Sequence, residues 1–573
     1  LCMRRPHTAL SALQLCLAAA LLGGCDDISI DFDDEDAGDM SDDGSGGGDV
    51  GTPPSAWMTP QFATGGDGFY RMPWPHDARL RGDGYVDLSD FPPVSAPLLR
   101  QYVAAVQANV RGYSIMPVVY VKLDGAADLA ALPEPRASLE PTGPVQLVDV
   151  SPEGCGGRIP VEVRLNRTAD ATIDADVLMV SPVPGFVLRP ATPYALVLLP
   201  SLGNADSLGV ATAPESAAAL RGDHPDAAVN RATAPARDCL PEAGVPLDAI
   251  AVATVFTTQD PLGELFALRQ AAAVDAAAPE VETFAYDDTL SRAGYATYRG
   301  TYQTPIYQQG ASPYATTGGG ILFDADGRPE QARTETVPFT VVAPRPGDGP
   351  YPLLIWVDGT GADDTSWVTS RLTQDLVRAG FVVAGYTAQF HGSRATPGAN
   401  EELHSFNFSN PDAFRNTFRQ QVADTVYFVR LMTEEASQLP DLPALDVSRV
   451  VYAGQSQGSL IGTMVAAVEP RIDAYVLNGV AGYLATVSVS RKDPFDIQAL
   501  VARLAQIPAD FDRFHPLMAL AQMGGDATDP HAFAPAWAGS DAHPDGAHVL
   551  LINGLSDTTS SVDGMNAVAI AGG

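Results

Sequence analysis

One serine in this sequence stands in a setting that would make its hydroxyl a nucleophile. Ser456 lies at the centre of Gly454-Gln455-Ser456-Gln457-Gly458, after residues 449–453 and before the apolar residues 459–467. The pattern predicts a strand, a sharp turn and a helix, with glycine where a side chain would clash in such a turn. The turn would expose the Ser456 hydroxyl and direct the backbone N–H of Gln457 at the oxyanion that forms when a carbonyl is attacked.

A second turn has the small residues that an oxyanion-binding loop needs. The apolar run 352–357 predicts a buried strand, and Asp358-Gly359-Thr360-Gly361 follows it directly. Small side chains would let the backbone approach a substrate, so the N–H of Gly359 or Thr360 is the candidate for the second oxyanion donor. The alternative is an ordinary glycine-rich connection from strand to helix.

Asp557 is the candidate for the acid that supports catalysis. It follows the apolar residues 549–552. A carboxylate at the end of a strand can orient a histidine and stabilise the cation that the histidine becomes. The alternative is that Asp557 caps the helix predicted to begin near Val562.

The histidine that would act as general base is missing from the expected place. The chain order serine, acid, histidine requires a histidine after Asp557, but none follows His548. We expect the sequence to be truncated, with this histidine beyond Gly573. His391, near the end of the predicted strand 381–386, precedes the nucleophile, so we assign it to shaping the pocket or holding its loop. The alternative base is an earlier histidine: His515, His531 or His543.

The second half of the chain alternates predicted strands with predicted helices. Residues 291–573 contain apolar runs suited to buried parallel strands, separated by helical segments such as 412–435. This alternation predicts an α/β fold with a doubly wound, mostly parallel sheet whose ligands bind at the carboxyl ends of the strands. Residues 55–290 contain mostly short strands and turns, which we interpret as a β-rich accessory domain.

Residues 481–547 form a long insertion between two predicted strands. Such an insertion would serve as a lid or as a wall for an acyl group, and ordinary packing is the alternative. Its large apolar residues include Phe495, Phe511, Phe514, Leu517 and Met518.

The N-terminal residues resemble an export and anchoring segment. Residues 1–25 contain the apolar run 9–22, which has signal-peptide length and is too short to span a bilayer comfortably. The run ends in Leu22-Gly23-Gly24-Cys25, which resembles the bacterial lipobox, so Cys25 would carry lipid and anchor the protein in a membrane. The alternative is an ordinary signal peptide that contains a cysteine. The acidic and glycine-rich residues 26–54 predict a disordered tether.

Charge and cysteine content limit the partners. The formal net charge of -35 excludes nucleic acid, whose phosphates would be repelled. Outside the N-terminal segment the sequence has two cysteines, Cys155 and Cys239, and in an oxidising compartment these would form one disulfide. Two cysteines supply too few ligands for a metal site, so we expect neither a metal nor a cofactor.

Six motifs follow one another along the chain and together resemble a known family. They are the lipobox, Phe256-Thr257-Thr258-Gln259-Asp260, Asp358-Gly359-Thr360-Gly361, His391-Gly392-Ser393-Arg394, the serine turn, and Gly554-Leu555-Ser556-Asp557. The series resembles bacterial lipoprotein α/β-hydrolases of the lipase and esterase type, including the surface-exposed virulence-factor lipases. Asp358 stands where that family usually has a histidine. The resemblance implies an α/β-hydrolase domain preceded by a β-rich domain.

The resemblance also implies a reaction and a location. The reaction would be hydrolysis of a carboxylic ester through an acyl-enzyme on Ser456, and fatty-acyl esters or lysophospholipids would suit a membrane-anchored enzyme. The protein would be an exported lipoprotein of the outer membrane or cell surface, with the periplasmic face as the alternative. A peptidase or amidase on the same fold remains open, because a triad does not reveal its leaving group. A non-catalytic surface protein with a degenerate hydrolase domain also remains open, because the base is missing.

Overall fold

The computed structural model describes residues 58–65, 68–124, 132–202, 209–345, 347, 349–398, 400–493 and 496–573. The predicted signal peptide, Cys25 and the tether lie outside these ranges. Within these ranges, no helix combines the length and the apolar character needed to cross a bilayer.

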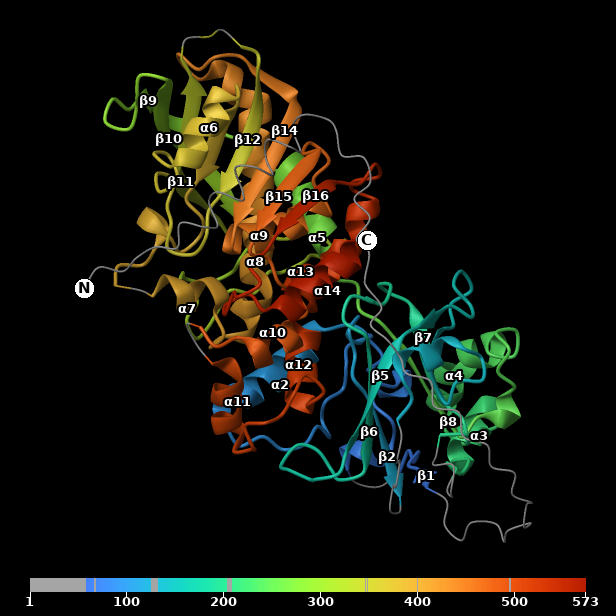
Figure 1. Ribbon diagram of the computed structural model, residues 1–573. Coiled ribbons are helices and arrows are strands. Elements are labelled where there is room, and N and C mark those ends of the chain that lie inside the picture. The colour runs from blue at the N-terminus through green and yellow to red at the C-terminus, as the bar shows by residue number, and fades with distance from the viewer. Residues whose placement is uncertain are drawn as a thin grey trace, which may run out of the picture.

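An eight-stranded sheet forms the centre of the second half of the chain (Figure 1). Its order is β16-β15-β14-β12-β13-β11-β10-β9. The five strands from β16 to β13 are parallel, and β11, β10 and β9 are antiparallel to their neighbours. The strands are β9 (Val281–Tyr286), β10 (Tyr295–Ile306), β11 (Arg333–Pro344), β12 (Tyr351–Val357), β13 (Val382–Tyr386), β14 (Leu445–Gln455), β15 (Ala474–Asn478) and β16 (His548–Ile552).

Helices cover both faces of this sheet, as the continuous apolar runs predict. Alternate residues of β12 point to opposite faces: Leu353 and Ile355 pack in one hydrophobic cluster, and Leu354 and Trp356 pack in another. The first cluster contains residues of α8 (Pro411–Arg430) and α9 (Gln457–Ala466), and the second contains residues of α6 (Arg371–Arg378). Further helices of this half are α5 (Pro261–Gln270), α7 (Glu401–Phe406) and α14 (Val562–Gly572).

Two antiparallel sheets of four strands lie in the first half of the chain. One has the order β1-β2-β6-β5 and the other the order β4-β3-β7-β8. Their strands are β1 (Thr59–Pro60), β2 (Val119–Asp124), β3 (Val145–Asp149), β4 (Arg158–Ile159), β5 (Val161–Asn166), β6 (Val177–Pro182), β7 (Pro193–Leu198) and β8 (Val252–Thr257). The accompanying helices are α2 (Pro97–Asn109), α3 (Pro214–Arg221) and α4 (Ala227–Cys239). The predicted disulfide between Cys155 and Cys239 is confirmed.

The predicted domain boundary at residue 290 does not coincide with a change of sheet. Strand β9 precedes this boundary but belongs to the eight-stranded sheet. Helix α5 also precedes this boundary, and Glu264 of α5 forms an ion pair with Arg419 of α8 at 2.6 Å. The boundary of the β-rich accessory domain therefore stays a prediction, because the elements that pack with the eight-stranded sheet already begin near α5.

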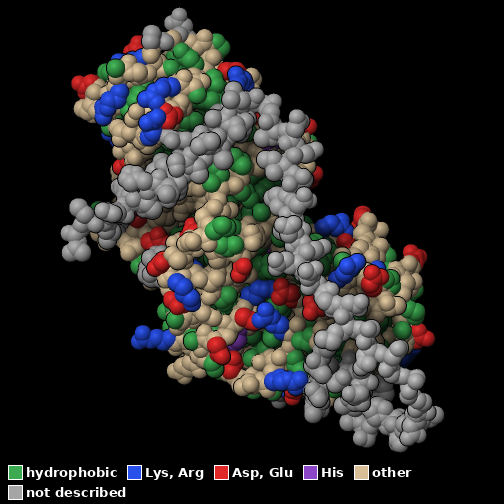
Figure 2. All heavy atoms as spheres, in the orientation of Figure 1, with side chains coloured by type: hydrophobic (Ala, Val, Ile, Leu, Met, Phe, Trp, Pro, Cys, Tyr) green, Lys and Arg blue, Asp and Glu red, His purple; other side chains and the backbone are tan. Residues whose placement is uncertain are grey.

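The insertion 481–547 is helical. It contains α10 (Leu484–Ser490), α11 (Ile497–Ala505), α12 (Pro516–Gly525) and α13 (Pro530–Phe533). Helices α10, α12 and α13 lie between the eight-stranded sheet and the two smaller sheets, and α11 lies to one side of them (Figure 1). On the face shown in Figure 2, acidic and basic side chains are interspersed wherever the atoms are coloured by type, so this face has no extended area of one charge.

Candidate active site

Ser456 occupies the strained turn that its neighbours predict. It joins β14 to α9 with φ 50° and ψ -113°, a backbone conformation that residues other than glycine rarely adopt. A Cβ atom added to Gly458 would lie 2.0 Å from the carbonyl oxygen of Val357, and one added to Gly454 would lie 2.6 Å from the carbonyl of Gly458. The backbone N–H of Ser456 donates to the carbonyl oxygen of Asn478 at 2.8 Å, which holds the turn against β15.

The loop after β12 lies directly beside this serine. A Cβ atom added to Gly359 would lie 3.2 Å from the Cβ of Ser456. The hydroxyl of Thr360 donates to the side-chain oxygen of Gln457 at 2.8 Å, which ties the loop to the turn. In the described part of the chain, the backbone N–H groups of Gln457 and Thr360 have no hydrogen-bond acceptor. Both groups are therefore available for an oxyanion.

The third candidate donor, Gly359, is already occupied. Its N–H donates to Oδ1 of Asp358 at 2.8 Å. Burial raises the pKa of Asp358, and the Gly359 N–H opposes this shift in part because it stabilises the carboxylate. Of the two predicted loop donors, Thr360 is thus the one that the structure leaves free.

Asp557 lies in a tight turn after β16. Its Oδ1 accepts the backbone N–H groups of Thr559 and Ser560, both at 2.9 Å. The following helix α14 is capped by Ser561, whose hydroxyl oxygen accepts the N–H of Gly564 at 3.3 Å. The alternative role of Asp557 as the cap of this helix is therefore not what the structure shows.

The turn that contains Asp557 contacts the loop after β15, and this loop lies beside the nucleophile. Ser560 donates its hydroxyl to the carbonyl oxygen of Gly479 at 3.2 Å, and a Cβ atom on Gly479 would lie 3.9 Å from the nitrogen of Ser456. Thr559 and Ser560 line a cavity together with Ser456. Asp557 itself lines neither cavity with Ser456, but it belongs to the turn whose next residues do.

His391 is a buried residue of the loop after β13. Its Nδ1 donates to the carbonyl oxygen of Gln389 at 2.8 Å, and burial lowers its pKa. It lines neither of the cavities that contain Ser456. The structure is compatible with the expectation that His391 holds its loop, whereas a contact with the pocket is not observed.

The three alternative bases lie away from Ser456. His515 contacts Oδ2 of Asp170 at 3.1 Å, and the Nε2 of His531 accepts the N–H of Gly185 at 3.1 Å. His543 contacts the carbonyl oxygen of Ala466 at 3.3 Å, at the opposite end of α9 from Ser456. Among the described histidines, none lines a cavity with Ser456, so the alternative of an earlier histidine as base stays a prediction without support from the cavity walls.

Two cavities of different character meet at Ser456. One is apolar, has a volume of about 90 Å³, and receives Leu484 and Val487 from α10 of the insertion. Its apolar wall also includes Phe406, Phe408, Phe414, Phe418 and Leu460. The other is an open cleft of about 700 Å³ with polar walls, which include Asp358, Thr360 and Glu402.

The sequence did not single out the phenylalanine wall. Phe414 and Phe418 are four residues apart on α8, a spacing that places both on one face, but this pattern equally describes core packing. The apolar residues expected to line the pocket lie elsewhere: Phe514, Leu517 and Met518 are buried in the core. Phe511 lines a separate cavity, and Phe495 lies outside the described ranges.

An ion pair stands where the two cavities join. Arg491, which lies directly after α10 and is only 5% exposed, contacts Oε1 of Glu402 on α7 at 2.6 Å. Its guanidinium also lies over the ring of Phe406, 5.2 Å from the centroid. Arg491 and Phe406 line both cavities, so these two side chains form part of the partition between the cavities.

The strand order and the serine turn define the class of fold. A mostly parallel sheet, in which a central strand leads through a strained serine into a helix, is the nucleophile elbow arrangement of α/β-hydrolases. The half of the chain that contains the eight-stranded sheet therefore has an α/β-hydrolase fold.

No family model matches the sequence, and no curated protein matches it. Among solved structures, acetyl xylan esterase 1 from Thermoanaerobacterium sp. JW/SL YS485 is 16% identical, with 54% of this chain and 83% of that chain covered and a TM-score of 0.37. The acetyl xylan esterase from Paenibacillus sp. R4 is 14% identical, with 55% and 85% covered and a TM-score of 0.37. The acylaminoacyl peptidase of Pyrococcus horikoshii is 12% identical, with 52% and 43% covered and a TM-score of 0.30. These similarities are weak, and the fold assignment depends on the chain's own geometry.

Proposed function

We propose that this protein is an exported, lipid-anchored serine hydrolase that cleaves carboxylic esters through an acyl-enzyme on Ser456. The observation that carries the proposal is the strained conformation of Ser456, next to two unoccupied backbone N–H groups and an apolar cavity. A disulfide between Cys155 and Cys239 supports an oxidising compartment. Anchoring through Cys25 depends on the lipobox alone.

The geometry supports a two-step acyl transfer. The Oγ of Ser456 attacks the ester carbonyl carbon while a base removes the hydroxyl proton, and the carbonyl oxygen gains negative charge. The N–H groups of Gln457 and Thr360 receive that oxyanion. The C–O bond to the alcohol then breaks, the base returns the proton to the departing oxygen, and water hydrolyses the acyl-enzyme by the same route.

The two cavities divide the substrate. The apolar cavity beside Ser456 suits the acyl chain, and the open polar cleft suits the alcohol portion. Because a cavity of about 150 Å³ accommodates a benzene molecule, a volume of about 90 Å³ suits an acyl group of few carbon atoms. We therefore favour short acyl esters over the long fatty-acyl esters that the family resemblance implies.

The proposal requires a histidine as general base, and no described histidine lines a cavity with Ser456. The Oδ2 of Asp557 has no hydrogen-bond partner in the described part of the chain, so it is free to accept an N–H from such a histidine.

A non-catalytic binding protein is the second candidate. Two observations favour it: no described histidine approaches Ser456, and the carboxyl of Asp358 occupies the N–H of Gly359. A carboxylate at this place would oppose the negative charge of an oxyanion.

Hydrolysis of matched esters and amides by the full-length natural protein distinguishes these candidates. We expect 4-nitrophenyl acetate to be cleaved and the 4-nitroanilide of the same acid to be cleaved poorly, with Ser456→Ala lowering the ester rate by about a thousand-fold or more. Faster cleavage of the anilide would favour the peptidase alternative. No cleavage of either compound would favour a binding protein.

A further inference from the structure

The segment from Phe256 to Asp260 connects the two halves of the molecule, and its glutamine reaches across. Gln259 follows β8 and is 3% exposed. Its Nε2 donates to the carbonyl oxygen of Met523 at 2.8 Å and to Oδ2 of Asp526 at 2.8 Å. Both acceptors belong to the end of α12 and the turn that follows it, inside the insertion. Gln259 thus binds the insertion from the side of the small sheets.

Asp526 also accepts a hydrogen bond from a second glutamine, Gln522. The side chain of Asp526 is fully buried, and its Oδ2 also accepts the backbone N–H of Ile115 at 2.9 Å. Its Oδ1 accepts Nε2 of Gln522 at 2.9 Å. The two carboxylate oxygens are therefore used on opposite sides, one towards the first half of the chain and one towards α12.

Gln522 and Asp529 then hold the beginning of α10. Gln522 donates from Nε2 to Oδ2 of Asp529 at 2.8 Å and accepts the N–H of Ala485 on Oε1 at 2.9 Å. Asp529 accepts the N–H of Tyr483 at 2.9 Å and that of Leu484 at 2.7 Å. Helix α10 has no cap from the side chain of its own N-cap residue, Tyr483. Its first N–H groups are satisfied by these two residues of the α12–α13 region instead.

Helix α10 forms part of the acyl cavity wall. Leu484, Val487 and Ser488 of α10 line the apolar cavity that contains Ser456, and so does Asp529 itself. The opposite wall comes from α8, which is buried along most of its length and is therefore fixed. A shift of the α10 N-terminus would change the volume available to an acyl group.

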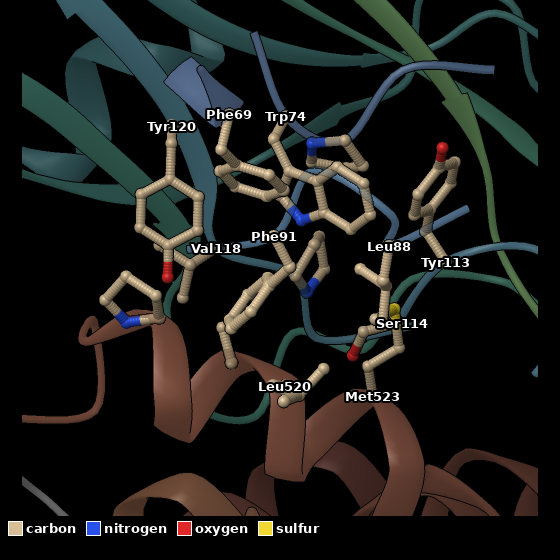
Figure 3. Close-up of a pocket in the computed structure, with 14 residues that line it drawn as sticks. Phe69, Trp74, Leu88, Phe91, Tyr113, Ser114, Val118, Tyr120, Leu520 and Met523 are labelled. Carbon is tan, nitrogen blue, oxygen red and sulfur yellow. The ribbon is translucent and has the colours of Figure 1, made fainter. Parts of the chain in front are cut away.

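The far side of α12 is clamped by aromatic residues. Figure 3 shows Leu520 and Met523 of α12 pointing towards Phe69, Trp74 and Tyr120 of the first half of the chain. The remaining space in this contact is a cavity of about 20 Å³, close to the volume that one water molecule needs. Helix α12 therefore has little freedom to move away from the residues that Gln259 binds.

We propose that Gln259 is a positioning residue that fixes α10 through Asp526, Gln522 and Asp529, and thereby sets the length of acyl group that Ser456 accepts. The inference rests on the proposed ester hydrolysis at Ser456. It gives a role to Gln259 within the Phe256–Asp260 segment, and it makes the first half of the chain part of the specificity of the site.

The test is Gln259→Ala in the full-length natural protein, measured with 4-nitrophenyl acetate and 4-nitrophenyl hexanoate. We expect the ratio of kcat/KM for the two esters to change by about three- to ten-fold, chiefly through KM for the hexanoate, with kcat for the acetate within about two-fold. The matched control is Gln146→Ala. Gln146 is also a buried glutamine of the first half of the chain. Its Nε2 donates to the carbonyl oxygens of Pro141 and Gly143, and neither of these residues belongs to the insertion.

A double variant separates positioning from general destabilisation. Gln522→Ala breaks the same route further along, so adding Gln259→Ala to it should change the ester ratio by less than about two-fold more. The proposal is overturned if Gln259→Ala changes the ratio no more than Gln146→Ala does, or if the two effects multiply independently. If the wild-type protein cleaves no ester, the proposed function fails. Amide hydrogen exchange in residues 484–490 then decides the positioning claim alone, with faster exchange expected in Gln259→Ala and not in Gln146→Ala.

Discussion

Gly458 lies against the carbonyl of Val357, so closely that a Cβ atom on the glycine would be 2.0 Å from that oxygen. This contact joins the first turn of α9 to the end of β12, the strand that carries the oxyanion loop. The nucleophile turn and the oxyanion loop are therefore positioned by one backbone contact that only glycine permits.

Replacing this glycine should separate the two parts of the site. Gly458→Ala should abolish labelling of Ser456 by a fluorophosphonate and lower the free energy of unfolding by about 3 kcal/mol, because the added methyl must displace backbone. Urea unfolding and labelling measure the two effects. The control is Gly294→Ala, where an added Cβ has no atom within 4 Å. Full labelling of Gly458→Ala would contradict the geometry described for the elbow.

Filling the apolar cavity should shorten the acyl group that is accepted. Val487 of α10 lines this cavity, whereas Val489 on the same helix does not. Val487→Phe should lower kcat/KM for 4-nitrophenyl hexanoate by about ten-fold or more and leave the acetate within about three-fold, since only the longer chain needs the lost volume. Steady-state kinetics of both esters provide the measurement. An equal loss for both esters, or the same selectivity change in Val489→Phe, would place the acyl group elsewhere.

Removal of the disulfide should destabilise the first half of the chain. Cys155 and Cys239 are 84 residues apart in sequence, so the bond removes substantial freedom from the unfolded chain. Replacing both residues with serine should lower the free energy of unfolding by about 2–5 kcal/mol, as measured by urea unfolding. Adding a reductant to the wild-type protein during unfolding should give a similar loss. Unchanged stability in both experiments would contradict a structural disulfide.

The buried Asp526 should make stability depend on pH. Burial raises its pKa to about 7, whereas an aspartate in an unfolded chain titrates near about 3.9. The folded protein therefore binds more protons between these values, so this contribution to stability is complete below about pH 4 and is lost as the pH rises through about 7.

Comparison of Asp526→Asn with the wild type isolates this effect. Asp77, whose pKa burial raises to about 6, gives a contribution of the same sign, and His531, whose pKa burial lowers to about 4, gives the opposite sign. Both are present in each protein and cancel in the difference. Urea unfolding at about pH 5 and about pH 8 should show a larger loss of stability with rising pH in the wild type than in the variant. The same pH dependence in both proteins would mean that Asp526 does not titrate in this range.

The sequence was sufficient for features that depend on local geometry. The turn at Ser456 was predictable because glycines at positions 454 and 458 permit the close backbone contacts that a strand-to-helix nucleophile turn requires. The parallel strands were predictable because β12 is buried on both faces and so consists of apolar residues throughout. The occupation of the Gly359 N–H was not predictable, because it depends on the side-chain conformation of Asp358.

Features that depend on contacts between distant segments were not predictable. The spacing of Phe414 and Phe418 equally describes core packing, and only the folded chain shows that α10 leaves a cavity beside them. The boundary near residue 290 misplaced β9, because its short alternating pattern does not reveal which sheet it joins. Gln259 belonged to a motif without an assigned role, because its partner Asp526 is 267 residues away in sequence.

The most direct test of the central claim is labelling of the full-length natural protein with a fluorophosphonate, followed by identification of the modified peptide by mass spectrometry. A serine with an active base and an oxyanion site reacts with this reagent, and an ordinary serine hydroxyl does not. We predict modification at Ser456 and its loss in Ser456→Ala. No modification of Ser456, under conditions in which a known serine esterase is fully labelled, would contradict its role as the nucleophile.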